Sequence, residues 1–223
     1  MRLVCAQVTW HYLKPTKKGG HMKILWLVIF FAVLIWSGIA PKDYLTWLLE
    51  VLPALLGLII MAGTYKKFRL THLVYALILI HCIILMIGGH YTYAEVPLFD
   101  WIKEVFHLER NNYDKVGHFA QGFVPALIVR EILIRKSVVN GRGWLNFIIP
   151  CICLALSAFY EFVEWWVALL SGQAAEAFLG TQGYVWDTQS DMALALLGAI
   201  LALLFLGRFH DRAIEQIQKQ ELP

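Results

Sequence analysis

The chain has 223 residues, of which 59% are apolar and only 16% are charged, and its net charge is +3. Because soluble domains carry about a quarter charged residues, this composition excludes an ordinary soluble globular domain. The basic residues stand in short runs beside apolar segments. That placement argues against a nucleic-acid partner and makes the lipid bilayer the expected one.

The first 21 residues are polar, and we expect them to be loose. They form either a cytoplasmic tail or an upstream extension of a chain that starts at Met22. A cleaved signal peptide is the alternative interpretation of the apolar run that follows. That run, 24–40, is long for a signal core and meets Pro41 without a small-x-small cleavage site. We therefore favour a membrane span.

Six apolar segments follow along the chain, each close to the roughly 20 residues that cross a bilayer as a helix. They are 24–40, 45–63, 72–91, 114–133, 145–170 and 187–206. The fourth is the least apolar, because polar side chains occupy its first two turns. The sequence predicts an all-α polytopic membrane protein, with the transmembrane domain over 22–210 and a cytoplasmic tail over 211–223.

The connecting segments alternate in charge. Segments 64–70 and 134–144 and both tails carry Lys and Arg, whereas segment 92–113 is acidic on balance. Positive segments are retained in the cytoplasm, so we predict a bacterial inner-membrane protein with both termini inside. Within 92–113, Pro97 can start a short helix, which would lie in the outer interface or form a packed cap.

Ionisable side chains on three of the spans recur at helical spacing. The pairs that share a helix face are Asp114 with His118, Glu161 with Glu164, and Asp187 with Asp191. At 1.5 Å per residue, they lie between the outer end of the membrane and about 14 Å inside it. Ionisable groups are costly in lipid and usually face the bundle interior. We therefore expect the six to converge on one pocket that opens outward.

The chemistry of such a pocket depends on what neutralises it. Five carboxylates at low dielectric cannot all stay ionised without a bound cation, shared protons or a basic partner such as Arg110. Oxygen ligands with one imidazole suit Mg, Mn, Ca or iron better than zinc. All six residues are therefore candidate metal ligands and candidate acid–base groups for hydrolysis by a metal-bound water.

Four functions remain open at this point. They are a metal-assisted hydrolase or transferase acting on a lipid or cell-envelope substrate, a small proton- or cation-coupled transporter, a polar network that only staples the spans, and a non-catalytic membrane partner. A transporter should continue the polar path to the cytoplasm, and the almost wholly apolar inner halves of the fifth and sixth spans count against it. Segment 176–186 would fold over the pocket, either as a substrate-contacting lid or as a structured cap.

Three motifs surround the candidate residues: NYDKVGHFAQG at 112–122, SAFYEFVEW at 157–165 and GTQGYVWDTQSDM at 180–192. Together they resemble the YjdF family of bacterial inner-membrane proteins. The Asp-Lys-x-x-His-Phe element at 114–119, followed by the Asp-x-x-x-Asp pair at 187–191, is also similar over a short stretch to VanZ-like membrane proteins, which are linked to glycopeptide resistance. Neither resemblance implies a reaction, and both agree with the polar faces chosen above.

Overall fold

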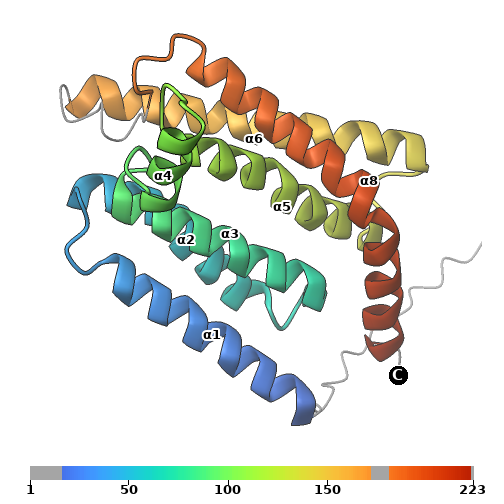
Figure 1. The fold of residues 1–223 in the computed structure, drawn as a ribbon. Coiled ribbons are helices and arrows are strands. Elements are labelled where there is room, and N and C mark those ends of the chain that lie inside the picture. The colour runs from blue at the N-terminus through green and yellow to red at the C-terminus, as the bar shows by residue number, and fades with distance from the viewer. Residues whose placement is uncertain (1–16, 172–180, 222–223) are drawn as a thin grey trace, which may run out of the picture.

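The computed structural model describes residues 17–171 and 181–221, and all regular structure in these ranges is helical. The helices are α1 (Lys17–Ser37), α2 (Tyr44–Thr64), α3 (His72–Tyr91), α4 (Pro97–Val105), α5 (Tyr113–Arg135), α6 (Arg142–Ser171) and α8 (Asp187–Glu221). Within the described ranges, six helices, all of these except α4, are long and apolar enough to cross a membrane. The predicted all-α architecture with six spans is confirmed (Figure 1).

The helix boundaries follow local sequence signals. The Asp43 carboxylate accepts a hydrogen bond from the N–H of Thr46 at 2.7 Å, which caps the start of α2. Helix α8 continues to Glu221, past the predicted end of its span at residue 206, so residues 211–221 of the expected tail belong to this helix. The expected loose segment falls mostly on residues 1–16, outside the described part of the chain.

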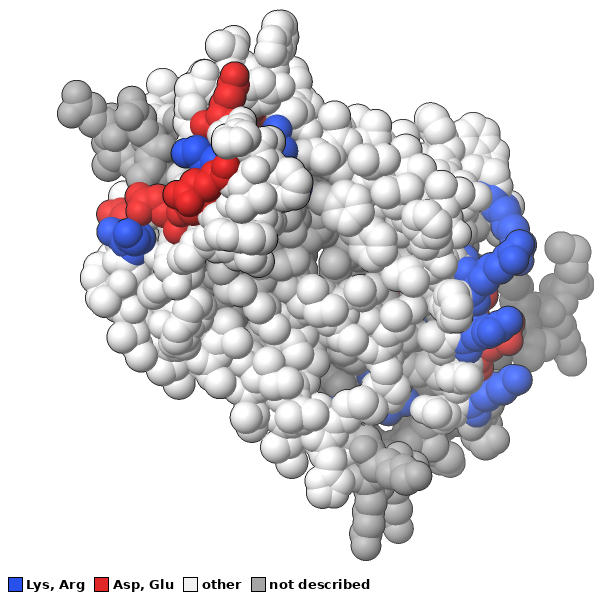
Figure 2. All heavy atoms as spheres, viewed as in Figure 1, with Lys and Arg blue, Asp and Glu red and all other residues white. Residues whose placement is uncertain are grey.

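The helix bundle has two chemically different ends. One end, here called the terminal end, holds the start of α1, the end of α8 and the turns after α2 and α5 (Figure 1). The other, the α4 end, holds α4 and the segment that precedes α8. On the face shown in Figure 2, Lys and Arg side chains gather at the terminal end and most Asp and Glu side chains at the α4 end.

We expect the terminal end to face the cytoplasm, because basic segments are the ones retained during membrane insertion. A reporter fused after residue 105, at the end of α4, should then report an external location. A fusion after residue 215, in α8, should report a cytoplasmic one. An external signal at 215 would contradict this orientation.

Helix α5 packs against α3, α6 and α8 and therefore sits at the centre of the bundle (Figure 1). Its approach to α8 depends on glycine. A Cβ atom at Gly122 would overlap the backbone of Ala195, and one at Gly198 would overlap the carbonyl oxygen of Phe119. The missing side chains let the two helices, and the acidic groups they carry, come together.

Helix α4 begins at Pro97, as predicted, and none of its residues is buried. The side chains of Leu98 and Trp101 are 61% and 58% exposed. The Phe99 ring anchors the helix against Tyr113, with ring centroids 5.2 Å apart. Exposed apolar side chains on a short helix at the end of a membrane bundle fit the interfacial position better than a packed cap.

Candidate functional site

The six predicted site residues lie toward the α4 end of the bundle, on three adjacent helices. Asp114 and His118 belong to α5, Glu161 and Glu164 to α6, and Asp187 and Asp191 to α8. Each of the five carboxyl residues is at most 9% exposed, and the His118 side chain is 12% exposed. Buried groups of this kind need paired charges, hydrogen bonds or a bound ion.

His118 lies between carboxylates from two other helices. Its Nδ1 is 3.9 Å from Oε1 of Glu161, and its Nε2 is 3.7 Å from Oδ2 of Asp191. One ligand atom from each of these residues lies within 4.8 Å of the other two. Oε1 of Glu161 and Oδ1 of Asp191 are buried and have no hydrogen-bond partner in the described part of the chain. We call these three residues the His118 triad.

The amide of Gln121 orients the imidazole. Its Oε1 lies 3.1 Å from Nδ1 of His118, one helical turn away on α5. When Nδ1–H donates to this oxygen, Nε2 keeps the lone pair that a metal ligand requires. That lone pair then faces the Asp191 carboxylate, and two electron-rich groups meet unless a cation or a proton lies between them.

Arg110 neutralises the other side of the site. Its guanidinium pairs with the carboxylates of Asp114 and Asp187, and all three residues are buried. Asp114, Asp187 and Asp191 also offer oxygens within 4.8 Å of one another. Because Arg110 occupies two of these carboxylates, the second cluster is already compensated. Among the described residues, Glu161 and Asp191 of the His118 triad form no ion pair with a lysine or arginine.

Glu164 belongs to a neighbouring part of the site. It lines a cavity of about 90 Å³ between α2, α3, α5 and α6, which His118 also lines. Glu50 and Tyr160 face the same cavity, and the Tyr160 hydroxyl donates to Oε2 of Glu50 at 3.3 Å. Burial beside Glu50 raises the pKa of Tyr93, in the loop after α3, well above its usual range. Its phenol therefore keeps its proton.

Sequence reasoning missed Glu50, His81 and the two tyrosines of this cavity. The available signal was Glu50 itself, the single charged residue inside the second apolar segment, because an ionisable group in a span usually faces the bundle interior. His81, on α3, also lines the cavity.

The described part of the expected lid, residues 181–186, packs against the loop that leads into α5. The Gln182 side chain donates to the Asn111 carbonyl at 2.8 Å and accepts from the Asn111 N–H at 3.0 Å. The Tyr184 ring lies 4.9 Å from Nζ of Lys115 and 5.5 Å from Cζ of Arg110. These contacts hold the segment next to Arg110. Residues 176–180 of the expected lid lie outside the described residues.

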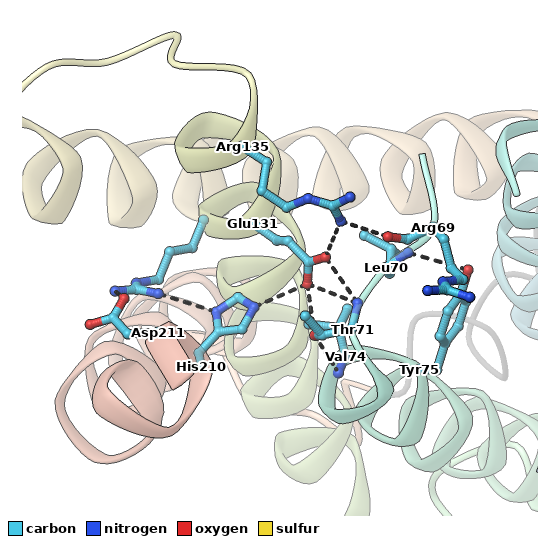
Figure 3. Close-up of polar contacts among 10 residues, drawn as sticks. Arg69, Leu70, Thr71, Val74, Tyr75, Glu131, Arg135, His210 and Asp211 are labelled. Atoms are coloured by element: carbon cyan, nitrogen blue, oxygen red, sulfur yellow. Dashed lines mark hydrogen bonds and ion pairs between the residues drawn. The ribbon is translucent and has the colours of Figure 1, made fainter. Parts of the chain in front are cut away.

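A second buried polar cluster lies at the terminal end and was also missed (Figure 3). The Glu131 carboxylate accepts from the Thr71 N–H at 2.9 Å, from the Thr71 hydroxyl at 2.8 Å and from Arg135 at 2.7 Å, and it lies 3.1 Å from Nε2 of His210. Arg130 pairs with Asp211 at 2.6 Å. These donors surround the Glu131 carboxylate and join α5 to the start of α3 and to α8.

Comparison with known proteins agrees with the family resemblance. Residues 22–212 match a family described as predicted membrane protein (DUF2238). The chain is 52% identical over 184 residues to the inner membrane protein YjdF of Escherichia coli (strain K12), an alignment that covers 82% of this chain and 88% of that protein. No solved structure matches the chain.

Proposed function

We propose that this chain, which belongs to the DUF2238 family of predicted membrane proteins and is an integral inner-membrane protein, binds a divalent cation through His118, Glu161 and Asp191. We propose further that the cation serves a hydrolase or transferase acting on a lipid or cell-envelope substrate. The observation that carries the proposal is that buried carboxylates from two helices flank the imidazole, and that each has one oxygen, Oε1 of Glu161 and Oδ1 of Asp191, without a hydrogen bond from the described residues.

The ligand set favours particular ions. Carboxylates suit Mg, Ca and Mn, whereas imidazole suits iron and zinc, so Mn²⁺ and Fe²⁺ combine the two preferences. Three protein ligands leave coordination positions for water and substrate. A divalent ion held there would act as a Lewis acid and make bound water a better nucleophile near neutral pH. Gln121 would keep Nε2 of His118 directed at the ion.

Arg110 supports a role in handling an anionic group. It is held at the mouth of the site by Asp114 and Asp187, which act as positioning residues. A guanidinium placed beside a metal site is suited to phosphate or to a developing negative charge. Since the same two aspartates flank Asp191, the guanidinium also offsets part of the negative charge around the triad.

The surroundings of the site support a membrane-borne substrate. Val185 and Trp186 precede α8 and are 85% and 63% exposed, and Trp101 on α4 is 58% exposed. Tryptophan at the end of a membrane bundle marks the head-group level. Asp187 and Asp114 begin their helices at that same end, so a lipid head group would meet the mouth of the site.

A transporter is less well supported. The cavity reaches His81, near the middle of α3, which extends the polar region inward. Along α5, however, the polar side chain of Gln121 and the cluster at Glu131 are separated by the buried apolar residues Val124 and Leu127. This apolar layer interrupts any continuous polar path along the central helix.

Titration with Mn²⁺ tests the proposal. Mn²⁺ should raise the melting temperature of the detergent-purified protein, because an ion that binds only the folded state at about a hundredfold excess over its Kd stabilises it by about 2.7 kcal/mol. Glu161→Gln should abolish this response. Glu104→Gln, exposed on α4, is the matched control and should retain it.

The stability of the metal-free variants distinguishes a functional site from a polar network that only holds the helices together. Removing one member of a crowded carboxylate group relieves repulsion, so metal-free Asp191→Asn should be at least as stable as the parent. In a purely structural network, the same change would destabilise the fold by several kcal/mol. Strong destabilisation of metal-free Asp191→Asn, together with no Mn²⁺ response in the parent, would refute the proposal.

A further inference from the structure

The cavity beside the His118 triad is a separate compartment. Its volume is about 90 Å³, well above the roughly 10–15 Å³ that one water molecule needs. It is bounded by α2, α3, α5 and α6, whereas the triad joins α5, α6 and α8. The two compartments share His118. The cavity is therefore large enough for a small functional group.

The lining of the cavity is acidic and aromatic. Three carboxylates, two phenol rings and two imidazoles line it: Glu50, Glu164 and the Arg110-paired Asp114, Tyr93 and Tyr160, and His81 and His118. The described residues that line it include neither Lys nor Arg. This chemistry excludes phosphate and other anions, and it attracts a positive charge.

Glu164 supplies an independent indication of a ligand. It is only 9% exposed, faces the cavity, and receives no hydrogen bond or ion pair from the described residues. Glu50, by contrast, is 5% exposed and accepts a hydrogen bond from Tyr160. A buried carboxylate that faces a cavity without a partner is costly, and a cation in the cavity would remove that cost.

We propose that this cavity binds a primary ammonium group, carried either by a small free amine or by the head group of a lipid. Its three N–H donors can be shared among the carboxylate oxygens of Glu50 and Glu164. The rings of Tyr93 and Tyr160 add cation–π attraction. Ethylammonium is a small carrier of such a group. The inference rests on the proposed function for the role of the amine, which is to hold one end of a substrate whose reacting group lies at the His118 triad.

Ethylammonium chloride is the probe for this site. Calorimetric titration into the detergent-purified protein should show saturable binding, which Glu164→Gln should weaken at least about tenfold by removing one partner of a buried charge pair. Glu50→Gln should weaken it as well, and Glu104→Gln on α4 is the control. Metal content measured on the same samples should stay unchanged in Glu164→Gln. Loss of amine binding in the cavity can therefore be distinguished from loss of metal binding at the His118 triad.

Two further arms identify the source and the selectivity. In vesicles, phosphatidylethanolamine should compete with ethylammonium if the amine is a lipid head group, whereas phosphatidylcholine should not. Competition by neither lipid would assign the cavity to a small free amine. Absence of saturable binding in the parent protein, equal binding in Glu164→Gln, or competition by sodium equal to that of ethylammonium would overturn the proposal.

Discussion

Replacing Glu131 by alanine is expected to destabilise the protein by about 3–5 kcal/mol, because it leaves buried charged and polar partners without an acceptor. Glu131 is 0% exposed and joins three helices through Thr71, Arg135 and His210 (Figure 3). Its removal leaves the buried imidazole of His210 and the backbone N–H of Thr71, at the start of α3, without their hydrogen-bond acceptor. Unfolding of the detergent-purified protein by denaturant measures the loss.

Glu215→Ala provides the matched control for this substitution. Glu215 lies on the exposed side of α8, near His210 in sequence, so its loss should change the unfolding free energy by no more than about 0.5 kcal/mol. Equal unfolding midpoints for Glu131→Ala and Glu215→Ala would show that Glu131 does not stabilise the contact between helices at the terminal end.

Gly122→Ala is expected to destabilise the protein by about 3 kcal/mol, because overpacking a rigid contact forces backbone to move. The added Cβ atom would overlap the carbonyl group of Ala195 on α8, which has no side-chain freedom with which to yield. The helices must separate, and this also moves Asp191 away from His118. Thermal unfolding of the purified variant, together with its Mn²⁺ response, measures both consequences.

The same substitution at Gly57 should have the opposite sign. Gly57 lies within α2, and a Cβ atom there meets no atom within 4 Å. In a helix interior alanine is more favourable than glycine by about 0.5–1 kcal/mol, so Gly57→Ala should be neutral or stabilising. A Gly122→Ala variant that unfolds like Gly57→Ala would show that α5 and α8 do not approach each other at this point.

The spans and the polar faces could be predicted from the sequence because both depend on local patterns. Apolar length determines a membrane span, and i,i+4 spacing determines which side chains share a face. This is why Asp114 and His118 were found together, and likewise Asp187 and Asp191. The helical extension past residue 206 was missed because polarity resumes at Arg208. The helix continues there because Ile214 and Ile217 are buried on one face.

The partnerships between helices were beyond sequence reasoning. Arg110 pairs with Asp187 across 77 positions of the chain, and Glu50 pairs with Tyr160 across 110. A single sequence gives the face of each helix but not which faces meet. For the same reason the contact between Glu131 and His210 could not be predicted. Glu131 lies inside the fourth predicted span, and His210 lies beyond the predicted end of the sixth.

Elemental analysis of the purified protein shows whether His118, Glu161 and Asp191 hold a metal ion. We expect about one divalent metal ion per chain, as for a single site with three protein ligands, and loss of this ion in Asp191→Asn and in His118→Ala. The Glu104→Gln protein, purified in parallel, should retain the parent's metal content. A parent protein that contains no metal after purification and reloading with Mn²⁺ or Fe²⁺, or an Asp191→Asn variant that retains the full amount, would contradict the proposed metal site.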